Sequence, residues 1–256
     1  MLKDITLGQY FPGNSIAHKL DPRTKILLVT LYIIALFSAK GWMGYAVMAV
    51  TLAACVKVSH VGLRALVRGL KPLVFIIAFT GILNMFFTPD THYLWEWGIL
   101  RVSVKGIENA LFMVIRIMLL VMGTFLMTYT TSPIRLTDGL ESLLNPLKKI
   151  HVPVHELAMM MAIALRFIPT LIEETDKIMS AQKARGADFD SGNIFQKAKA
   201  LVPILVPLFI SAFRRADELA TAMECRCYHG GEGRTKLHVL KYQRRDYVAL
   251  AGGVVI

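Results

Sequence analysis

The sequence has few of the residues that build a catalytic or disulfide-bonded protein. Its 3 cysteines among 256 residues, Cys55, Cys225 and Cys227, are too few and too unevenly placed for a disulfide framework. It also lacks the phosphate-binding pattern GxxxxGK[ST], because the stretch GGEGRTK at residues 230–236 has neither that spacing nor a preceding apolar strand. No Ser–His–Asp arrangement or paired carboxylates stand out. We therefore assign no catalytic residue and expect this chain not to hydrolyse ATP itself.

Metal ligands are also incomplete. Cys225, Cys227 and His229 alternate along the chain, and His151 and His155 stand four residues apart. Neither group has four ligands close together, as a structural zinc site requires. We therefore expect no metal and no cofactor in this chain.

The composition is that of a membrane protein. Hydrophobic residues make up 55% of the chain and the mean hydropathy is +0.51. The net charge of +11 would suggest nucleic acid in a soluble protein, but in a membrane protein such an excess lies in cytoplasmic loops. The first 25 residues have no apolar core or cleavage site, so they do not form a signal peptide. The expected surroundings are a lipid bilayer, with no nucleic acid partner.

Apolar segments predict the membrane spans, each of which needs ~20 residues of helix. Four segments and the start of a fifth qualify: Ile26–Ala39, Trp42–Val56, Leu73–Thr88, Ala110–Thr130 and Tyr247–Ile256. The first two segments are expected to form a tight helical hairpin, and each is close to the shortest length that can span a bilayer. Asp21-Pro22 is expected to start the helix of the first span. We therefore expect an all-α integral membrane protein with about five transmembrane helices and two long amphipathic helices on the cytoplasmic side. Its expected regions are 1–131 (four spans), 132–234 (the cytoplasmic helices) and 235–256 (the start of a last span, where the chain stops early).

The distribution of basic residues predicts the orientation. Residues 1–25 and 57–71 are rich in Lys and Arg, whereas the stretch TPDTHYLWEWG has none. The positive-inside rule places the N-terminus and residues 57–71 in the cytoplasm and residues 89–99 outside. Four spans then return the chain to the cytoplasm near Ser132.

Two long helices are predicted after the fourth span, over Val154–Arg185 and from Ile194 to about Cys227. Their apolar residues recur in steps of three and four. Pro169 is expected to kink the first helix, and Gly186 to end it. Because their apolar cores are short and flanked by charges, we expect a hairpin beneath the membrane or dipping into its inner leaflet.

Each of these helices ends in an arginine within a repeated pattern, AQKARG and AMECRC. Alignment of the two arginines places Asp176 on Asp217, Ile178 on Leu219 and Ala181 on Ala222. A single arginine in a last helical turn would simply complement the helix dipole. Repetition with small neighbours on both occasions favours two exposed side chains that enter two similar sockets, and hence a partner that is a dimer of like subunits.

Three stretches resemble one known family. LGQYFPGNSIAHKLDPRTKI at residues 7–26, AQKARG and AMECRCY resemble, in this order, the signatures of EcfT, the CbiQ-like transmembrane component of energy-coupling factor transporters. The resemblance implies a multi-pass protein of a bacterial or archaeal cell membrane with two ABC-type ATPase partners, identical or different, which bind the ATP and Mg. It also implies a small membrane S component that binds a vitamin or metal ion. The second motif departs from Ala-Arg-Gly, and Cys227 is not expected to take the left-handed cap that glycine allows.

The resemblance also assigns residues to contacts. Those expected to dock the ATPases are Ala184, Arg185, Gly186, Cys225, Arg226 and Cys227. Those expected to contact the S component are Met160, Met161, Ala164, Ile168, Phe209 and Phe213. Arg116 lies within the fourth span, where we expect it to pair with Glu108, to reach the outer surface, or to contact the S component.

Two other functions fit parts of the sequence. A self-sufficient channel or secondary carrier would need a polar pathway, for which the spans offer only Asn84, Glu108 and Arg116, without an inverted repeat. A membrane anchor for a cytoplasmic signalling complex would use the same arginine contacts without transport. The sequence favours a non-catalytic subunit that transmits the motion of the ATPases to the S component.

Overall fold

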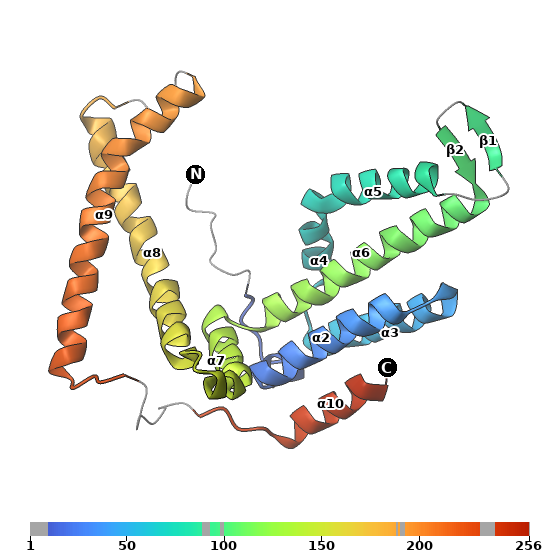
Figure 1. Cartoon of the computed structure of the whole chain (residues 1–256), viewed down its shortest axis with the longest axis horizontal. Coiled ribbons are helices and arrows are strands. Elements are labelled where there is room, and N and C mark those ends of the chain that lie inside the picture. The colour runs from blue at the N-terminus through green and yellow to red at the C-terminus, as the bar shows by residue number, and fades with distance from the viewer. Residues whose placement is uncertain are drawn as a thin grey trace. The chain divides into compact units, whose positions relative to one another are not determined.

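The computed structural model describes residues 10–88, 93–97, 100–187, 189, 193–230 and 239–255 (Figure 1). The elements are α1 (Ile16–Lys19), α2 (Pro22–Ser38), α3 (Gly41–Ser59), α4 (Leu63–Leu70), η1 (Lys71–Leu73), α5 (Val74–Phe87), β1 (Tyr93–Trp97), β2 (Leu100–Ser103), α6 (Val104–Thr130), α7 (Pro133–Leu144), η2 (Asn145–Ile150), α8 (Val154–Ala184), α9 (Ile194–Cys225) and α10 (Arg244–Val255). The predicted all-α membrane fold is confirmed, with one short pair of strands added.

The described residues fall into two compact units. One, here the span unit, lies between Gly8 and Gly139 and between Leu240 and Ile256. The other, the helical-hairpin unit, contains the described residues from Leu140 to Val239, among them α8 and α9. Each unit is described separately below.

Among the described residues, four helical segments are long and apolar enough to cross a membrane: Gly41–Ser59, Leu63–Phe87, Val104–Thr130 and Val154–Ala184. The first three match the predicted second, third and fourth spans, except that Thr88 lies beyond the end of α5. Helix α2, which contains most of the predicted first span, has 17 residues. The fourth segment is α8, and the prediction that its apolar core is too short to span the membrane is wrong. Its 31 residues stay helical through Pro169, so an apolar window fits before the charged stretch that follows.

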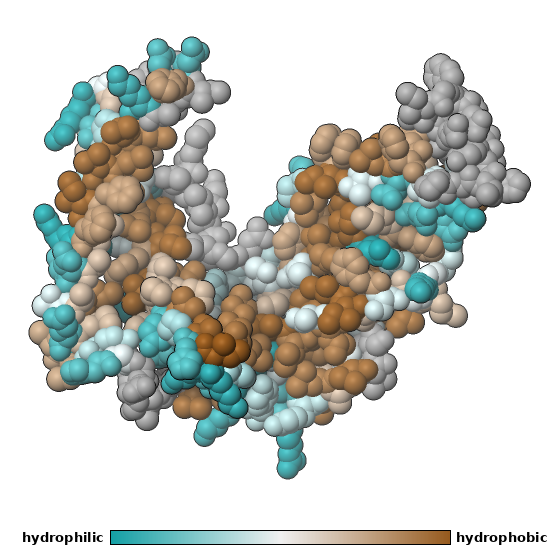
Figure 2. All heavy atoms as spheres, viewed as in Figure 1, coloured by the Kyte–Doolittle hydropathy of each residue, from teal (hydrophilic) through white to brown (hydrophobic). Residues whose placement is uncertain are grey.

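The core of the span unit lies among α2, α3, α4 and α6. Its buried side chains are Leu36, Tyr45, Met48, Leu52, Val56, Leu66, Leu119 and Tyr129. Most other large apolar side chains face outward, and Phe75, for example, is 80% exposed. Figure 2 shows hydrophobic residues over much of the visible surface of this unit. So large an exposed apolar surface is expected of helices in contact with lipid.

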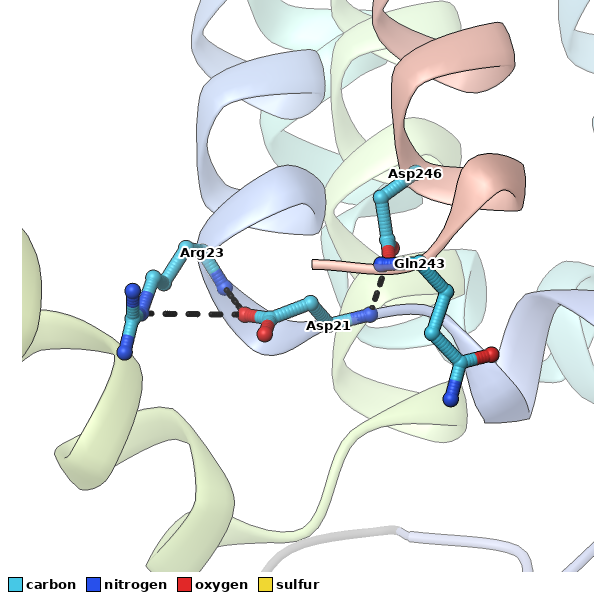
Figure 3. A network of polar contacts seen from close by, with 4 residues as sticks. All are labelled: Asp21, Arg23, Gln243 and Asp246. Atoms are coloured by element: carbon cyan, nitrogen blue, oxygen red, sulfur yellow. Dashed lines mark hydrogen bonds and ion pairs between the residues drawn. The ribbon is translucent and has the colours of Figure 1, made fainter. Parts of the chain in front are cut away.

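A network of polar contacts ties the start of α10 to the start of α2 (Figure 3). Asp21 is the N-cap of α2, as predicted, and its side chain accepts a hydrogen bond of 2.9 Å from the Arg23 backbone N–H. Asp246, only 1% exposed, accepts hydrogen bonds from the backbone N–H of Asp21 (2.8 Å) and of Gln243 (2.7 Å). A carboxylate from one end of the chain therefore stabilises the entry to the first long helix at the other.

The strands β1 and β2 pair antiparallel; β1 lies in the predicted outer loop, and β2 lies between that loop and the predicted fourth span. The following helix α6 begins at Val104, before the predicted start at Ala110. Ser103 explains the earlier start, because its hydroxyl caps the helix by accepting a 2.9 Å hydrogen bond from the Gly106 N–H.

Candidate functional site

Helices α8 and α9 form the antiparallel hairpin that the sequence predicts, and their bounds are close to the predicted ones. In the middle of α8, Glu174 accepts hydrogen bonds from Arg215 (2.6 Å) and Ser211 (3.0 Å) of α9. Near the start of α8, the Met159 sulfur accepts a 3.3 Å hydrogen bond from the hydroxyl of Tyr228, just beyond α9. The two helices therefore run in opposite directions, and in Figure 1 they lie closest near the end of α8 and lean apart toward its start, where Tyr228 reaches Met159.

This arrangement places the two arginines at opposite ends of the hairpin. Arg185 follows the end of α8, close to Gln182, whose amide donates a 3.4 Å hydrogen bond to the Pro203 carbonyl. Arg226 follows the end of α9, at the level of Met159 on α8. At ~1.5 Å of rise per residue, the stretch of α8 from Met159 to Arg185 separates the two positions by on the order of 40 Å.

The two helix ends have the same hydrogen-bonding pattern, residue for residue. At the first, the Gly186 N–H donates to the Lys183 carbonyl and the Ala187 N–H to the Gln182 carbonyl, both at 3.0 Å. At the second, the N–H groups of Cys227 and Tyr228 donate to the carbonyls of Glu224 (2.8 Å) and Met223 (3.0 Å). Both pairs of bonds make the Schellman motif that commonly closes helices. The repeated sequence pattern is therefore also a repeated backbone structure.

The prediction that Cys227 does not take a left-handed conformation is wrong. Its φ of 56° is left-handed, as is the φ of 87° at Gly186. An L residue accepts this conformation at a cost of roughly 1–2 kcal/mol, which the two hydrogen bonds that close the helix offset here. Replacement of glycine by cysteine therefore leaves the end of α9, and the placement of Arg226, the same as in the first motif.

The two arginine side chains lie at the surface together with their small neighbours. Ala184, Arg185, Gly186, Cys225, Arg226 and Cys227 are all exposed. Within the described part of the chain, no carboxylate makes an ion pair with Arg185 or Arg226. Each guanidinium can therefore offer its planar set of N–H donors to an acidic or carbonyl-lined partner.

The residues assigned to the S component form two neighbouring apolar areas rather than one cluster. On α8, Met160 and Met161 are 58% and 41% exposed, Ala164 is exposed and Ile168 is half-buried. On α9, the rings of Phe209 and Phe213 stack with centroids 6.4 Å apart and are 62% and 67% exposed. The Glu174–Arg215 contact places the two phenylalanines beside the part of α8 near Glu174. Ile168 lies between that part of α8 and Met160.

The possible metal ligands have other contacts. His155 pairs through Nδ1 with Glu141 at 3.0 Å, and His229 Nδ1 lies 2.8 Å from the Cys227 carbonyl oxygen. The part of the chain that the structure describes contains no group of three or more His, Cys, Asp or Glu side chains placed to hold a metal ion.

Arg116 has a partner that the sequence did not suggest. Its Nε donates a 2.9 Å hydrogen bond to the hydroxyl of Tyr45 on α3, and its guanidinium lies 5.5 Å from the Phe37 ring centroid. Of the alternatives, pairing with Glu108 is wrong, since these two described residues make no ion pair.

Comparison with known proteins matches this architecture to one family. The family model CbiQ, described as "Cobalt transport protein", matches residues 13–237, a range that includes both arginine motifs. The chain belongs to the CbiQ family. Relatives share its full length: the energy-coupling factor transporter transmembrane protein EcfT of Ruminiclostridium cellulolyticum is 54% identical over 100% of this chain and 95% of its own. The EcfT of Bacillus subtilis is 46% identical over 100% of this chain and 97% of its own, and that of Lactococcus lactis is 44% identical over 100% and 96%.

Membership of the CbiQ family makes this chain an EcfT-type transmembrane component of an energy-coupling factor transporter, and a membrane protein. The relatives carry names of transporter components rather than of enzymes. Sequence reasoning found the two arginine motifs but missed the Glu174–Arg215 contact that holds the two helices together. The run of charged residues from Glu173 to Lys177 could have suggested this contact, because one of these residues, Glu174, faces α9 rather than solvent.

Proposed function

We propose that this chain is the non-catalytic coupling subunit of an energy-coupling factor importer. It transmits the ATP-driven motion of two ABC-type ATPase subunits, identical or different, to a small membrane S component. That S component binds the substrate, a vitamin or a metal ion. ATP and Mg are bound by the ATPases, and this chain supplies the docking surfaces.

The observation that carries this proposal is the pair of matched helix ends. Arg185 and Arg226 are exposed, end their helices in the same Schellman motif and lie at opposite ends of one antiparallel hairpin. Two equal projections separated by tens of ångströms suit two equal sockets, one on each subunit of an ATPase dimer.

The contacts between α8 and α9 support the transmission of motion. Glu174 joins both Ser211 and Arg215, so a displacement at one end of the hairpin is carried through the pair of helices. We propose that closure of the ATPase dimer moves the two arginine ends relative to each other. The apolar areas on α8 and α9 then shift or tilt the S component that rests on them. Met160 and Met161 suit this role, since flexible thioethers adapt to a changing neighbour.

The proposed orientation follows the basic residues. The N-terminal segment and the described residues 57–71 face the cytoplasm, and the chain returns to that side after α6. We place the region 132–234 at the inner surface, within reach of the ATPases. Helix α8 is long and apolar enough to span, but a spanning α8 would put Arg185 and Arg226 on opposite sides of the membrane. Helix α10 starts a last membrane helix.

Charge reversal tests the proposal on the assembled transporter. Arg185→Glu and Arg226→Glu are each expected to lower substrate uptake and ATPase retention, and the double variant to lose the ATPases during purification. Arg214→Glu is the matched control, because Arg214 is an exposed arginine of α9 away from both helix ends. Normal uptake and ATPase retention in the double variant would contradict the docking role.

A further inference from the structure

A polar pocket lies in the span unit, where the chain turns from α2 into α3 beside α5 and α6. Its volume is about 320 Å³, at the lower end of the range found for ligand pockets. The lining residues used below are Lys40, Tyr45, Asn84, Asn109 and Arg116. Such a polar lining is unusual for a bundle of helices whose outer surface is mostly apolar.

The pocket carries positive charge without a compensating carboxylate. Lys40 and Arg116 both line it, and no acidic residue is among the described residues of the lining. Arg116 donates from its Nε to Tyr45, and its two terminal nitrogens donate no hydrogen bond to any described residue. Those nitrogens carry four N–H donors, a planar arrangement that suits the oxygens of a phosphate or carboxylate.

Neutral donors complete the lining. The Asn109 side chain has no hydrogen-bonding partner among the described residues, and Asn84 uses only its amide nitrogen, toward the Thr80 carbonyl. The Tyr45 hydroxyl accepts from Arg116, so its own hydrogen is available to an acceptor in the pocket. The lining therefore offers many more donors than acceptors.

The pocket also lies at the depth of a lipid headgroup. Trp42, 55% exposed, lies in the first turn of α3 next to the pocket, with its ring tilted by 55° against that of Phe112. Tryptophan is enriched at membrane interfaces, so we place this end of α3 there. Arg116 is about two turns inside the apolar part of α6 that starts at Ala110. Its side chain points toward the turn before it, so its guanidinium reaches the interface while its stem stays among apolar groups.

We infer that this pocket binds the anionic phosphate headgroup of a membrane phospholipid through Arg116 and Lys40. The two cations favour a headgroup with a net negative charge, such as phosphatidylglycerol, over a zwitterionic one. A bound phosphate offsets the cost of keeping a guanidinium close to the hydrocarbon. This inference is independent of the coupling role, because it concerns the span unit alone.

Lipid binding to the purified transporter tests the inference. The complex is washed in detergent, titrated with dioleoylphosphatidylglycerol or dioleoylphosphatidylcholine, and the bound lipid is counted by native mass spectrometry. The unmodified chain is expected to hold one phosphatidylglycerol more tightly than phosphatidylcholine. Arg116→Met is expected to weaken that binding about tenfold, the worth of one strong charge-assisted hydrogen bond.

Two further variants keep the test decisive. Lys40→Met changes an exposed side chain, so it preserves the fold and is expected to weaken phosphatidylglycerol binding severalfold even if Arg116→Met does not fold. Lys57→Met makes the same change at the other end of α3 and is expected to leave this binding unchanged.

A competition experiment distinguishes a lipid phosphate from a free phosphate ion as the occupant of the pocket. Millimolar inorganic phosphate is not expected to displace the lipid; displacement would support the anion pocket but make a free anion its occupant. Equal binding of both lipids together with no effect of phosphate would overturn the inference. So would loss of the S component from the Arg116 and Lys40 variants with lipid binding intact, since the pocket would then be a protein contact.

Discussion

Gly186 and Cys227 provide a pair of opposite substitutions that test whether the two helix ends are equivalent. Both residues are left-handed, with φ of 87° and 56°, but only the first is glycine. A methyl group on Gly186 would meet no atom within 4 Å, so Gly186→Ala changes the backbone preference alone. The reverse change, Cys227→Gly, removes the same strain at the second site.

The expected magnitudes follow from two opposing terms. A left-handed conformation costs an L residue roughly 1–2 kcal/mol, whereas alanine in place of glycine restricts the unfolded chain by about 0.4–1 kcal/mol. The net destabilisation in Gly186→Ala is about 0.5–1 kcal/mol, which corresponds to a roughly two- to fivefold change in an opening equilibrium. Cys227→Gly should stabilise the end of α9 by a similar amount.

Hydrogen exchange measured by mass spectrometry reports these openings at the amides that make the bonds. In Gly186→Ala, exchange at residues 186 and 187 should be about two- to fivefold faster, and in Cys227→Gly exchange at residues 227 and 228 should be slower by the same factor. Gly252→Ala is the control: Gly252 lies in α10 with open space around it and no left-handed φ, so alanine should slow exchange there. Faster exchange in Cys227→Gly would refute the reasoning, because the cysteine side chain would then be needed at that position.

Three further predictions concern the contacts that hold each unit together. Asp246→Asn should lower the melting temperature of the purified protein by several degrees, because the buried Asp21 N–H loses a charged acceptor worth about 1–3 kcal/mol; an unchanged melting temperature would show that α10 is held by other contacts. Gly106→Ala should destabilise the span unit by roughly 1–3 kcal/mol, because its new methyl group would lie 2.7 Å from a backbone carbonyl oxygen of α5 that cannot turn away; full expression and normal gel filtration would argue against this. In a double-mutant cycle, Glu174→Gln and Arg215→Gln should show a coupling of about 0.5–1 kcal/mol that weakens in high salt, and additive effects would mean that this partly exposed pair does not join the helices.

The local features of this chain could be predicted from its sequence. The apolar period of α8 and α9 set their bounds closely, and Asp21 with Pro22 marked the start of α2. These features depend on neighbours a few residues away, as helix periodicity and capping do. The aligned arginines pointed in the same way to the repeated pattern, since both helix ends contain the whole repeat within one short segment.

Features that depend on distant residues could not be predicted in this way. Arg116 finds its hydrogen-bonding partner Tyr45 on another helix, and nothing in the spacing along α6 indicates it. The same holds for Asp246, which accepts a hydrogen bond from the N-cap residue of α2 at the far end of the chain. The left-handed Cys227 was missed for a different reason: the bonds that close this helix are local, but they outweighed the statistical preference for glycine.

Photo-crosslinking at the two helix ends tests the central claim most directly. A benzophenone amino acid would replace Arg185, Arg226 or both in the assembled transporter, with Arg214 replaced as the control, and the masses of the crosslinked products would be measured. If the two ends dock into two like sockets, each single replacement links one ATPase subunit, and the double replacement links this chain to two ATPase subunits at once. Products that contain only lipid or the S component, or a double replacement that never links more than one ATPase, would contradict the claim.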